Sequence, residues 1–318
     1  MNREGLQKTT AFVSHYDCAR HDTGWNHPEH QGRLPAIMRA VYQDMLTLFE
    51  PLLEVQGRHA TEPELQLVHS AAYLARLREW VQDAADLGRP TEIEPGIVVS
   101  DASWDAARAA AGCVLEAIDT VEAGTTRNAF CAVRPPGRDA GADDPGGFGL
   151  VNSTAIGARY LTASLGRQPV LVFEWGGGAP SGLRDVLAAD PAVTVATVAV
   201  GDGAAPSVDP LLRTIPSRSG IEALREATAE LLETVAARNP PAFVLLSAGF
   251  DVLESDPLGD LALQTADLYS LTREVREWSD RICEGRLVSV LEGGYDARPL
   301  GAAVVQHLRA LADLDPAD

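Results

Sequence analysis

Five side chains with acid–base or hydrogen-bonding chemistry stand at the ends of apolar runs. Arg138 and Asp139 follow one run, Asp251 follows another, and Glu174 and Tyr295 end two more. If these side chains converge, the site holds three carboxylates, a phenol and a guanidinium. A buried Asp among other carboxylates has a raised pKa and can act as an acid or a base. This set suits metal-free proton transfer, such as isomerisation, dehydration or cyclisation.

The same residues have a second, structural interpretation. Arg138 and Asp139 can pair with nearby charges in a salt-bridge network that only stabilises the fold. The glycine run 176–178 could cradle an anion with its backbone amides, but it lacks the G-K-[ST] that completes a phosphate loop. These glycines are therefore interpreted as enlarging the floor of a pocket.

Elements that could position these residues alternate along the chain. Continuous apolar runs predict buried strands over residues 11–16, 129–133, 169–173, 193–200, 242–250 and 287–295. Amphipathic segments predict helices over residues 103–123, 153–165 and 220–239, with Ser103 as the N-cap of the first. Residues 201–219 are expected to form an extended loop. The alternation predicts one α/β domain over residues 1–318, with a parallel sheet and helices on both faces.

Composition restricts the partners and the setting. The net charge of −19 argues against binding nucleic acid or an anionic membrane surface, and suits a neutral or cationic small molecule. The sequence has no apolar run of eighteen residues, so a membrane-spanning helix is not expected. The first residues lack the apolar region of a secretory signal. The four cysteines form no CxxC motif, so we expect a reduced, cytoplasmic protein; they are Cys18, Cys113, Cys131 and Cys283.

Six short motifs occur along the chain: HPE at 27–29, VHS at 68–70, RPPG at 134–137, GFG at 147–149, SAGFD at 247–251 and LEGGY at 291–295. In this order they resemble the signature segments of the zinc-dependent deacetylases, which are histone deacetylases and acetylpolyamine amidohydrolases. The resemblance implies the three-layer arginase–deacetylase fold, with a central, mostly parallel sheet flanked by helices. By analogy it also implies a homodimer, and the Ala- and Arg-rich composition is typical of a GC-rich bacterial source.

That family hydrolyses amides with a zinc ion held by Asp, His and Asp, a histidine pair that moves protons, and a tyrosine that stabilises the oxyanion. Matched to the family's motifs, the first two zinc ligands fall on Gly176 and Gly178 and the third on Asp251. The histidine pair falls on Arg138 and Asp139. One carboxylate cannot supply the three ligands that catalytic zinc needs, so the resemblance implies the scaffold without its zinc site.

Other matched positions define the surroundings of the cleft. Tyr295 matches the oxyanion tyrosine, and Glu174 stands where an aspartate often binds a structural potassium ion. Phe148 matches an aromatic of the acyl-lysine tunnel, while His27 and Trp25 are expected near its entrance. Trp175 is interpreted as core packing. Rescue of a metal site by His21, His27 and His30 is disfavoured because three converging ligands are required.

Three hypotheses follow from these observations. The first is a metal-free binding protein that uses the old cleft for a small molecule or a protein partner. The second is an enzyme repurposed for acid–base chemistry on a small molecule, with Asp139, Asp251 and Tyr295 as its groups. The third is a metal-dependent amidohydrolase acting on acetyl-lysine, acetylpolyamine or a related small amide. We favour loss of zinc hydrolysis.

Overall fold

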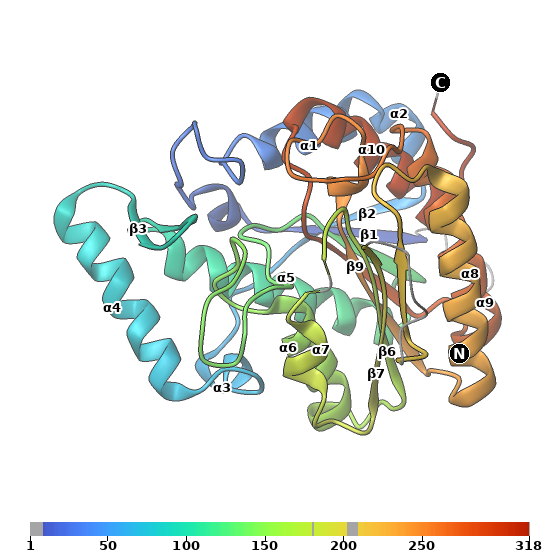
Figure 1. Ribbon diagram of the computed structural model, residues 1–318, viewed down its shortest axis with the longest axis horizontal. Coiled ribbons are helices and arrows are strands. Elements are labelled where there is room, and N and C mark those ends of the chain that lie inside the picture. Colours follow the sequence, from blue (N-terminus) through green and yellow to red (C-terminus); the bar gives the residue numbers. More distant parts are fainter. Residues whose placement is uncertain (1–8, 180, 202–208, 318) are drawn as a thin grey trace.

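A computed structural model describes residues 9–179, 181–201 and 209–317 of the chain (Figure 1). Its centre is an eight-stranded sheet in the order β2-β1-β5-β10-β9-β6-β7-β8, with every neighbouring pair parallel. The strands are β1 Thr10–Ser14, β2 Leu52–Gln56, β5 Asn128–Cys131, β6 Val170–Trp175, β7 Val193–Val200, β8 Leu212–Ile215, β9 Phe243–Ala248 and β10 Leu287–Leu291. A separate antiparallel pair joins β3 (Thr91–Glu94) to β4 (Ile97–Val99).

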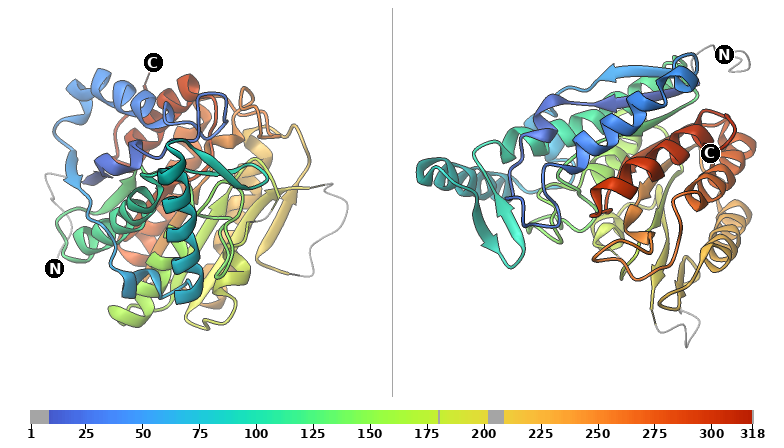
Figure 2. Two further views of the ribbon diagram at one scale, coloured as in Figure 1. Left: turned by 90° about the vertical axis from the view of Figure 1, so that its left-hand side faces the viewer. Right: turned by 90° about the horizontal axis from the view of Figure 1, so that it is seen from above.

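Helices cover both faces of the sheet (Figure 2). One face carries α1 (Arg33–Gln43), α8 (Ile221–Arg238), α9 (Asp267–Cys283) and α10 (Ala297–Leu311), which contact one another in the order α1, α10, α9, α8. The other face carries α5 (Ser103–Glu122), α6 (Ser153–Arg159) and α7 (Leu183–Leu187), and α4 (Ala71–Leu87) packs on the outer side of α5. Short helices complete the fold: α2 Met45–Leu48, α3 Glu62–Leu65, η1 Tyr16–Ala19, η2 Tyr160–Ser164 and η3 Phe250–Val252.

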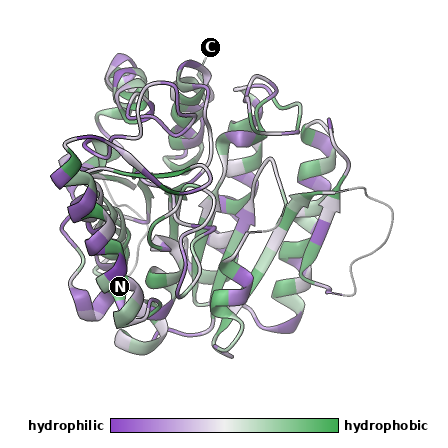
Figure 3. Ribbon diagram, turned by 60° about the vertical axis from the view of Figure 1, so that its left-hand side comes forward, coloured by the Kyte–Doolittle hydropathy of each residue, from purple (hydrophilic) through white to green (hydrophobic). Residues whose placement is uncertain are grey.

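The central strands are mostly apolar because both of their faces are covered. All residues of β5, β6, β9 and β10 are buried. The strands accordingly form a green centre in Figure 3, and the helices carry much of the purple, hydrophilic colour. Within the described ranges, no helix combines the length and the apolar character needed to cross a membrane.

The α/β fold with a parallel sheet between two helical layers is confirmed. All six expected strands and all three expected helices exist, and α8 ends at Arg238, before Pro240 and Pro241. Ser103 is not an N-cap: it is the first residue of α5, and its hydroxyl instead accepts from the Ser100 amide and contacts His21. The loop expected over 201–219 is partly wrong because β8 forms there as an edge strand, while residues 202–208 lie outside the described residues.

Candidate functional site

Most of the residues expected at the site lie at the carboxyl edge of the sheet, where parallel strands place their functional groups. Arg138 follows β5, Gly176 follows β6 directly, Asp251 lies in η3 after β9, and Tyr295 follows β10. These strands are neighbours in the order β5-β10-β9-β6. Residues from four distant parts of the chain therefore meet at one edge of the sheet.

An ion pair between Arg138 and Asp251 lies at the centre of this group. Nη2 of Arg138 donates to Oδ2 of Asp251 at 2.8 Å, and Nη1 reaches the Trp175 carbonyl at 3.5 Å. The two side chains are only 11% and 7% exposed. Burial alone lowers the pKa of Arg138, but the charges of Asp251, Glu174 and Asp139 raise it above its usual value overall. The guanidinium therefore remains charged in the cleft.

Glycines make the space that this ion pair fills. A Cβ atom built at Gly176 would lie 2.0 Å from Nη1 of Arg138, and one built at Gly293 would lie 2.5 Å from Cγ of Asp251. Real Cβ atoms do not approach other atoms so closely. A Cβ atom at Gly178, by contrast, would have no described atom within 4 Å. Gly176 and Arg138 are thus coupled sterically, whereas no described atom would restrict a Cβ atom at Gly178.

Asp139 is the accessible carboxylate of the site. Its side chain is 39% exposed, and Oδ2 lies 3.7 Å from Nε of Arg138. Burial raises the pKa of Asp139, Arg138 opposes this, and the charge of Asp251 adds to the rise. A carboxyl group with a raised pKa and access to solvent is suited to exchanging a proton with a ligand.

An aromatic wall stands beside these charged groups. The rings of Tyr295 and Phe148 meet edge to face with centroids 5.3 Å apart, and Phe148 meets His27 at 4.8 Å. His27 is fixed from behind by a contact of 3.0 Å between Nε2 and the Gly96 carbonyl. The guanidinium of Arg33 lies 5.0 Å from the centre of the Tyr295 ring. Burial raises the pKa of Tyr295, so its hydroxyl remains a hydrogen-bond donor at neutral pH.

Glu174 lies behind the ion pair in the sheet. Its Oε2 accepts a hydrogen bond from the Thr197 hydroxyl at 3.1 Å, while Oε1 has no well-formed hydrogen bond from the described residues. Burial raises the pKa of Glu174, and Arg138 opposes that rise. An under-satisfied buried carboxylate is compatible with a monovalent cation, so the potassium site remains a prediction.

Sequence reasoning missed the residue that holds Arg138 in place. Oε2 of Glu292 accepts from the amides of Gly137 and Arg138 at 2.8 and 3.1 Å, and Oε1 accepts from the Thr154 hydroxyl at 3.1 Å. Burial raises the pKa of Glu292 to about 7. The signal was its position, because Glu292 follows β10 directly and precedes Tyr295 by three residues.

A buried cluster of Glu29, Arg33 and Arg134 was also missed. Glu29 accepts from Arg134 Nε at 2.5 Å and from Arg33 Nη1 at 3.0 Å, and all three residues are fully buried. Arg33 Nε in turn donates to the Gly294 carbonyl at 2.6 Å. The spacing of Glu29 and Arg33 by four residues could have indicated this pairing. The cluster fixes the HPE segment against the loop that carries Tyr295.

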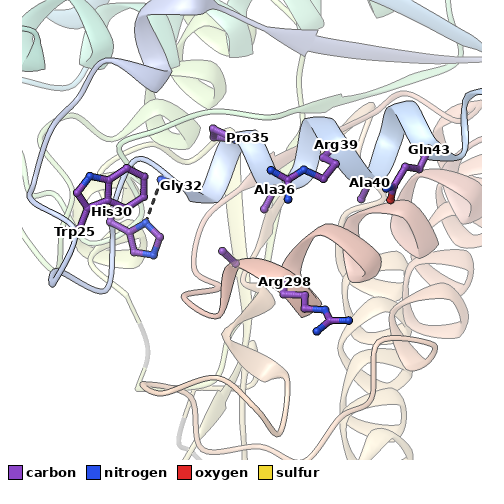
Figure 4. Close-up of a pocket in the computed structure, with 10 residues that line it drawn as sticks. Trp25, His30, Gly32, Pro35, Ala36, Arg39, Ala40, Gln43 and Arg298 are labelled. Carbon is purple, nitrogen blue, oxygen red and sulfur yellow. Dashed lines mark hydrogen bonds between the residues drawn. The ribbon is translucent and has the colours of Figure 1, made fainter.

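Trp25 and the remaining histidines lie elsewhere. Trp25 is 69% exposed and lines, with His30, a groove of about 610 Å³ between α1 and α10 (Figure 4). His21 is buried, with Nδ1 2.8 Å from the Ser103 hydroxyl. The structure therefore places His27 with Phe148 and Tyr295, but it does not bring Trp25, His21 or His30 to that group. Trp175 is fully buried in the core, as expected.

The parallel eight-stranded sheet and its two helical layers define a protein of the arginase–deacetylase architecture. The chain belongs to the histone deacetylase domain family, whose pattern matches residues 27–311. This places the resemblance over nearly the whole described chain and confirms the family that the six motifs indicated.

Individual relatives support the same assignment. Histone deacetylase 14, chloroplastic, of Arabidopsis thaliana is 28% identical over 91% of this chain and 74% of its own length. A probable deacetylase of Archaeoglobus fulgidus is 26% identical over 95% and 85%. The human polyamine deacetylase HDAC10 is 28% identical over 97% of this chain and 48% of its own length. The crystal structure of the HDA15 HD domain superposes with a TM-score of 0.85 at 23% identity, over 98% of this chain and 90% of that one, and supports the fold.

Proposed function

We propose that this protein has left zinc-dependent deacetylation and binds a neutral or cationic small molecule in a metal-free cleft around Arg138, Asp251 and Tyr295. The observation that carries the proposal is the buried ion pair of Arg138 and Asp251, with Nη2 and Oδ2 2.8 Å apart. This pair uses the one carboxylate left among the family's three zinc-ligand positions.

The residues present do not fit a zinc ion. Catalytic zinc takes three protein ligands at about 2.0–2.2 Å for oxygen and nitrogen, and Gly176 and Gly178 have no ligating side chain. Arg138 adds a positive charge bonded directly to Asp251, the remaining candidate. A divalent cation bound to Asp251 would be repelled by that adjacent positive charge. Zinc chemistry is therefore not part of the mechanism proposed here.

The same groups offer complementary contacts for an organic ligand. Asp139 presents a partly exposed carboxylate, and Tyr295 presents a hydroxyl donor. The wall of Phe148 and His27 offers apolar ring surface next to them. Ligand sites generally combine such an apolar wall with a few converging polar groups. A cationic group would be attracted to Asp139 and, over longer range, to a chain of net charge −19.

A second candidate, acid–base catalysis, is favoured by one observation at Asp139. Its carboxyl combines a raised pKa with partial exposure, and both properties suit a group that exchanges protons with a ligand. Tyr295 would stabilise a developing negative charge by donating its hydroxyl hydrogen. Arg138 would neutralise the charge of Asp251 by pairing with it.

The curated relatives favour a third candidate, because they are named as deacetylases. Hydrolysis of acetyl-lysine or acetylpolyamine by this chain would need ligands other than those at the matched positions. A homodimer and a cytoplasmic location likewise remain predictions. Light scattering after size exclusion would check the first, and fractionation of the native host would check the second.

The test combines binding and turnover in purified protein. We expect acetyl-lysine and acetylpolyamine reporters to remain intact with and without added zinc, whereas amines and acetylated amines should raise the melting temperature of the protein. Asp139→Asn should abolish that thermal shift. For the acid–base candidate, the same substitution should abolish any isomerisation or dehydration activity that is found. Zinc-dependent deacetylation by the wild type that is lost in Asp251→Asn would refute the proposal. Deacetylation that survives in Asp251→Ala would show that the site has been assigned to the wrong residues.

A further inference from the structure

We propose a divalent transition-metal site, of the kind that takes zinc, formed by His15, Asp17 and His59 at the carboxyl ends of β1 and β2. The inference does not depend on the proposed function, because these residues belong to neither the cleft nor the six motifs. In the part of the chain that the structure describes, they form the one group of three or more His, Cys, Asp or Glu side chains with metal-sized spacing.

The three donor groups already lie within the reach of one ion. Nε2 of His59 is 2.7 Å from Oδ2 of Asp17, Nδ1 of His15 is 3.6 Å from the same oxygen, and all three donors lie within 4.8 Å of one another. Tetrahedral zinc with bonds near 2.0–2.1 Å separates its ligands by about 3.3 Å. The observed distances bracket this value, so small side-chain rotations would complete the set.

The fold supplies these residues from two segments. His15 directly follows β1 and accepts a hydrogen bond from the Asp17 amide at the start of η1, and His59 comes three residues after β2. Because β1 and β2 are parallel neighbours, their carboxyl ends bring the segments together. The old cleft belongs to β5, β10, β9 and β6 of the same sheet, so the two groups share an edge but no residues.

The chemistry of the donors suits a borderline cation. Two imidazoles and one carboxylate match the ligand types of three-ligand zinc sites, which leave a position for water. Histidine ligates through a ring nitrogen that carries no proton. The ion would therefore take the place of the proton between Nε2 of His59 and Oδ2 of Asp17, which lie 2.7 Å apart.

Neighbouring groups determine what an ion must displace. Arg20 Nη1 binds Oδ1 of Asp17 at 3.0 Å, which orients the carboxylate and leaves Oδ2 for the metal. The ion would replace the hydrogen bond between the Asp17 amide and Nδ1 of His15, which is 3.1 Å long. The side chains are 15%, 12% and 30% exposed for His15, Asp17 and His59, so an ion can enter from solvent.

Cobalt(II) provides a direct probe, because its visible d–d bands report four-coordinate nitrogen and oxygen ligation. We expect the full chain to bind about one Co²⁺ or Zn²⁺ with such bands. His59→Ala should weaken binding at least about tenfold and remove the bands. His59→Cys should restore binding with an added thiolate charge-transfer band, and His30→Ala should leave binding unchanged. Circular dichroism and the melting temperature confirm that each variant is folded.

Each other outcome overturns the inference. Cobalt or zinc binding that is unchanged in His59→Ala, or no binding in the full chain at micromolar metal, removes the site. Binding that is lost in Asp251→Asn but not in His59→Ala would place the ion in the old cleft. That result would overturn the proposed function as well, whereas failure of the His59 site alone leaves the proposed function standing.

Discussion

The guanidinium of Arg138 occupies the space where a side chain on Gly176 would begin, since a Cβ atom there would lie 2.0 Å from Nη1. The two positions match a proton-handling histidine and a zinc-binding aspartate in the deacetylases that the motifs resemble. The two positions therefore depend on each other sterically. The Arg138 side chain fits only because Gly176 has no side chain. On the proposed loss of the zinc site, this coupling would keep the region closely packed without metal ligands.

Gly176→Ala tests that coupling. The added methyl group must move a guanidinium that Asp251 holds, and we expect a loss of about 1–3 kcal/mol in the free energy of unfolding. In an Arg138→Ala background the same change should cost much less, giving a coupling energy above about 1 kcal/mol in urea-unfolding experiments. Additive effects of the two substitutions would contradict the account.

Arg138→Met tests the energetic role of the ion pair. Removing one partner of a buried pair leaves Asp251 charged and uncompensated, which should cost about 3 kcal/mol of unfolding free energy. Adding Asp251→Asn should recover part of that loss. The matched control is Arg39→Met at an exposed position of α1, where a change within about 0.5 kcal/mol is expected. Equal effects at both arginines would show that the pair is not special.

Reconstruction of the metal ligands tests whether the scaffold still fits zinc. Gly178→His should be accommodated because a Cβ atom there meets no described atom within 4 Å. With Arg138→His and Gly176→Asp added, the variant would present Asp, His and Asp around one position. We expect this triple variant, in a His59→Ala background, to hold about one zinc per chain after dialysis. The control with alanine at positions 176 and 178 should hold none; retention by that control would mean that zinc binds elsewhere.

Glu292 should make stability depend on pH. Its pKa is raised by burial to about 7 in the folded protein, above its unfolded value, so the folded state binds the extra proton. Its contribution to stability is fully present below the unfolded pKa and is lost as the pH rises through about 7. Glu292→Gln removes this titration because a glutamine amide does not ionise. It can also keep the contacts, with its oxygen accepting from the Gly137 and Arg138 amides and its nitrogen facing the Thr154 hydroxyl.

The comparison of wild type with Glu292→Gln isolates that effect. Relative to wild type, the variant should gain about 3 kcal/mol of unfolding free energy between pH 5 and pH 8. Urea unfolding at both pH values measures the change. A constant difference between the two proteins across this range would show that Glu292 titrates normally.

Much of the fold could be predicted because its signals are local. Continuous apolar runs such as 242–250 belong to strands covered on both faces, and the prolines after Asn239 end a helix. The edge strand β8 was missed because LRTI is half polar and short, and Ser103 was misassigned because its hydroxyl bonds to Ser100 and His21 instead of capping α5.

The site could be predicted only where motifs carried it. Arg138 and Asp251 lie in hydrogen-bonding contact, but this pairing depends on distances that no sequence pattern encodes. The roles of these residues and of Tyr295 in a site stay predictions. Glu292 was missed because its role is to accept hydrogen bonds from two backbone amides. His15 and His59 lie 44 residues apart in the sequence, and only the pairing of β1 with β2 brings them together.

The most direct measurement of the central claim is an anomalous-scattering map at the zinc edge from crystals of the full chain grown with zinc. We predict no zinc peak between Asp251 and Gly178 and an Arg138 guanidinium within hydrogen-bonding distance of Asp251; the further inference adds a peak beside Asp17 and His59. A zinc ion bound to Asp251, with Arg138 displaced from the cleft, would contradict the account and return this protein to the zinc hydrolases.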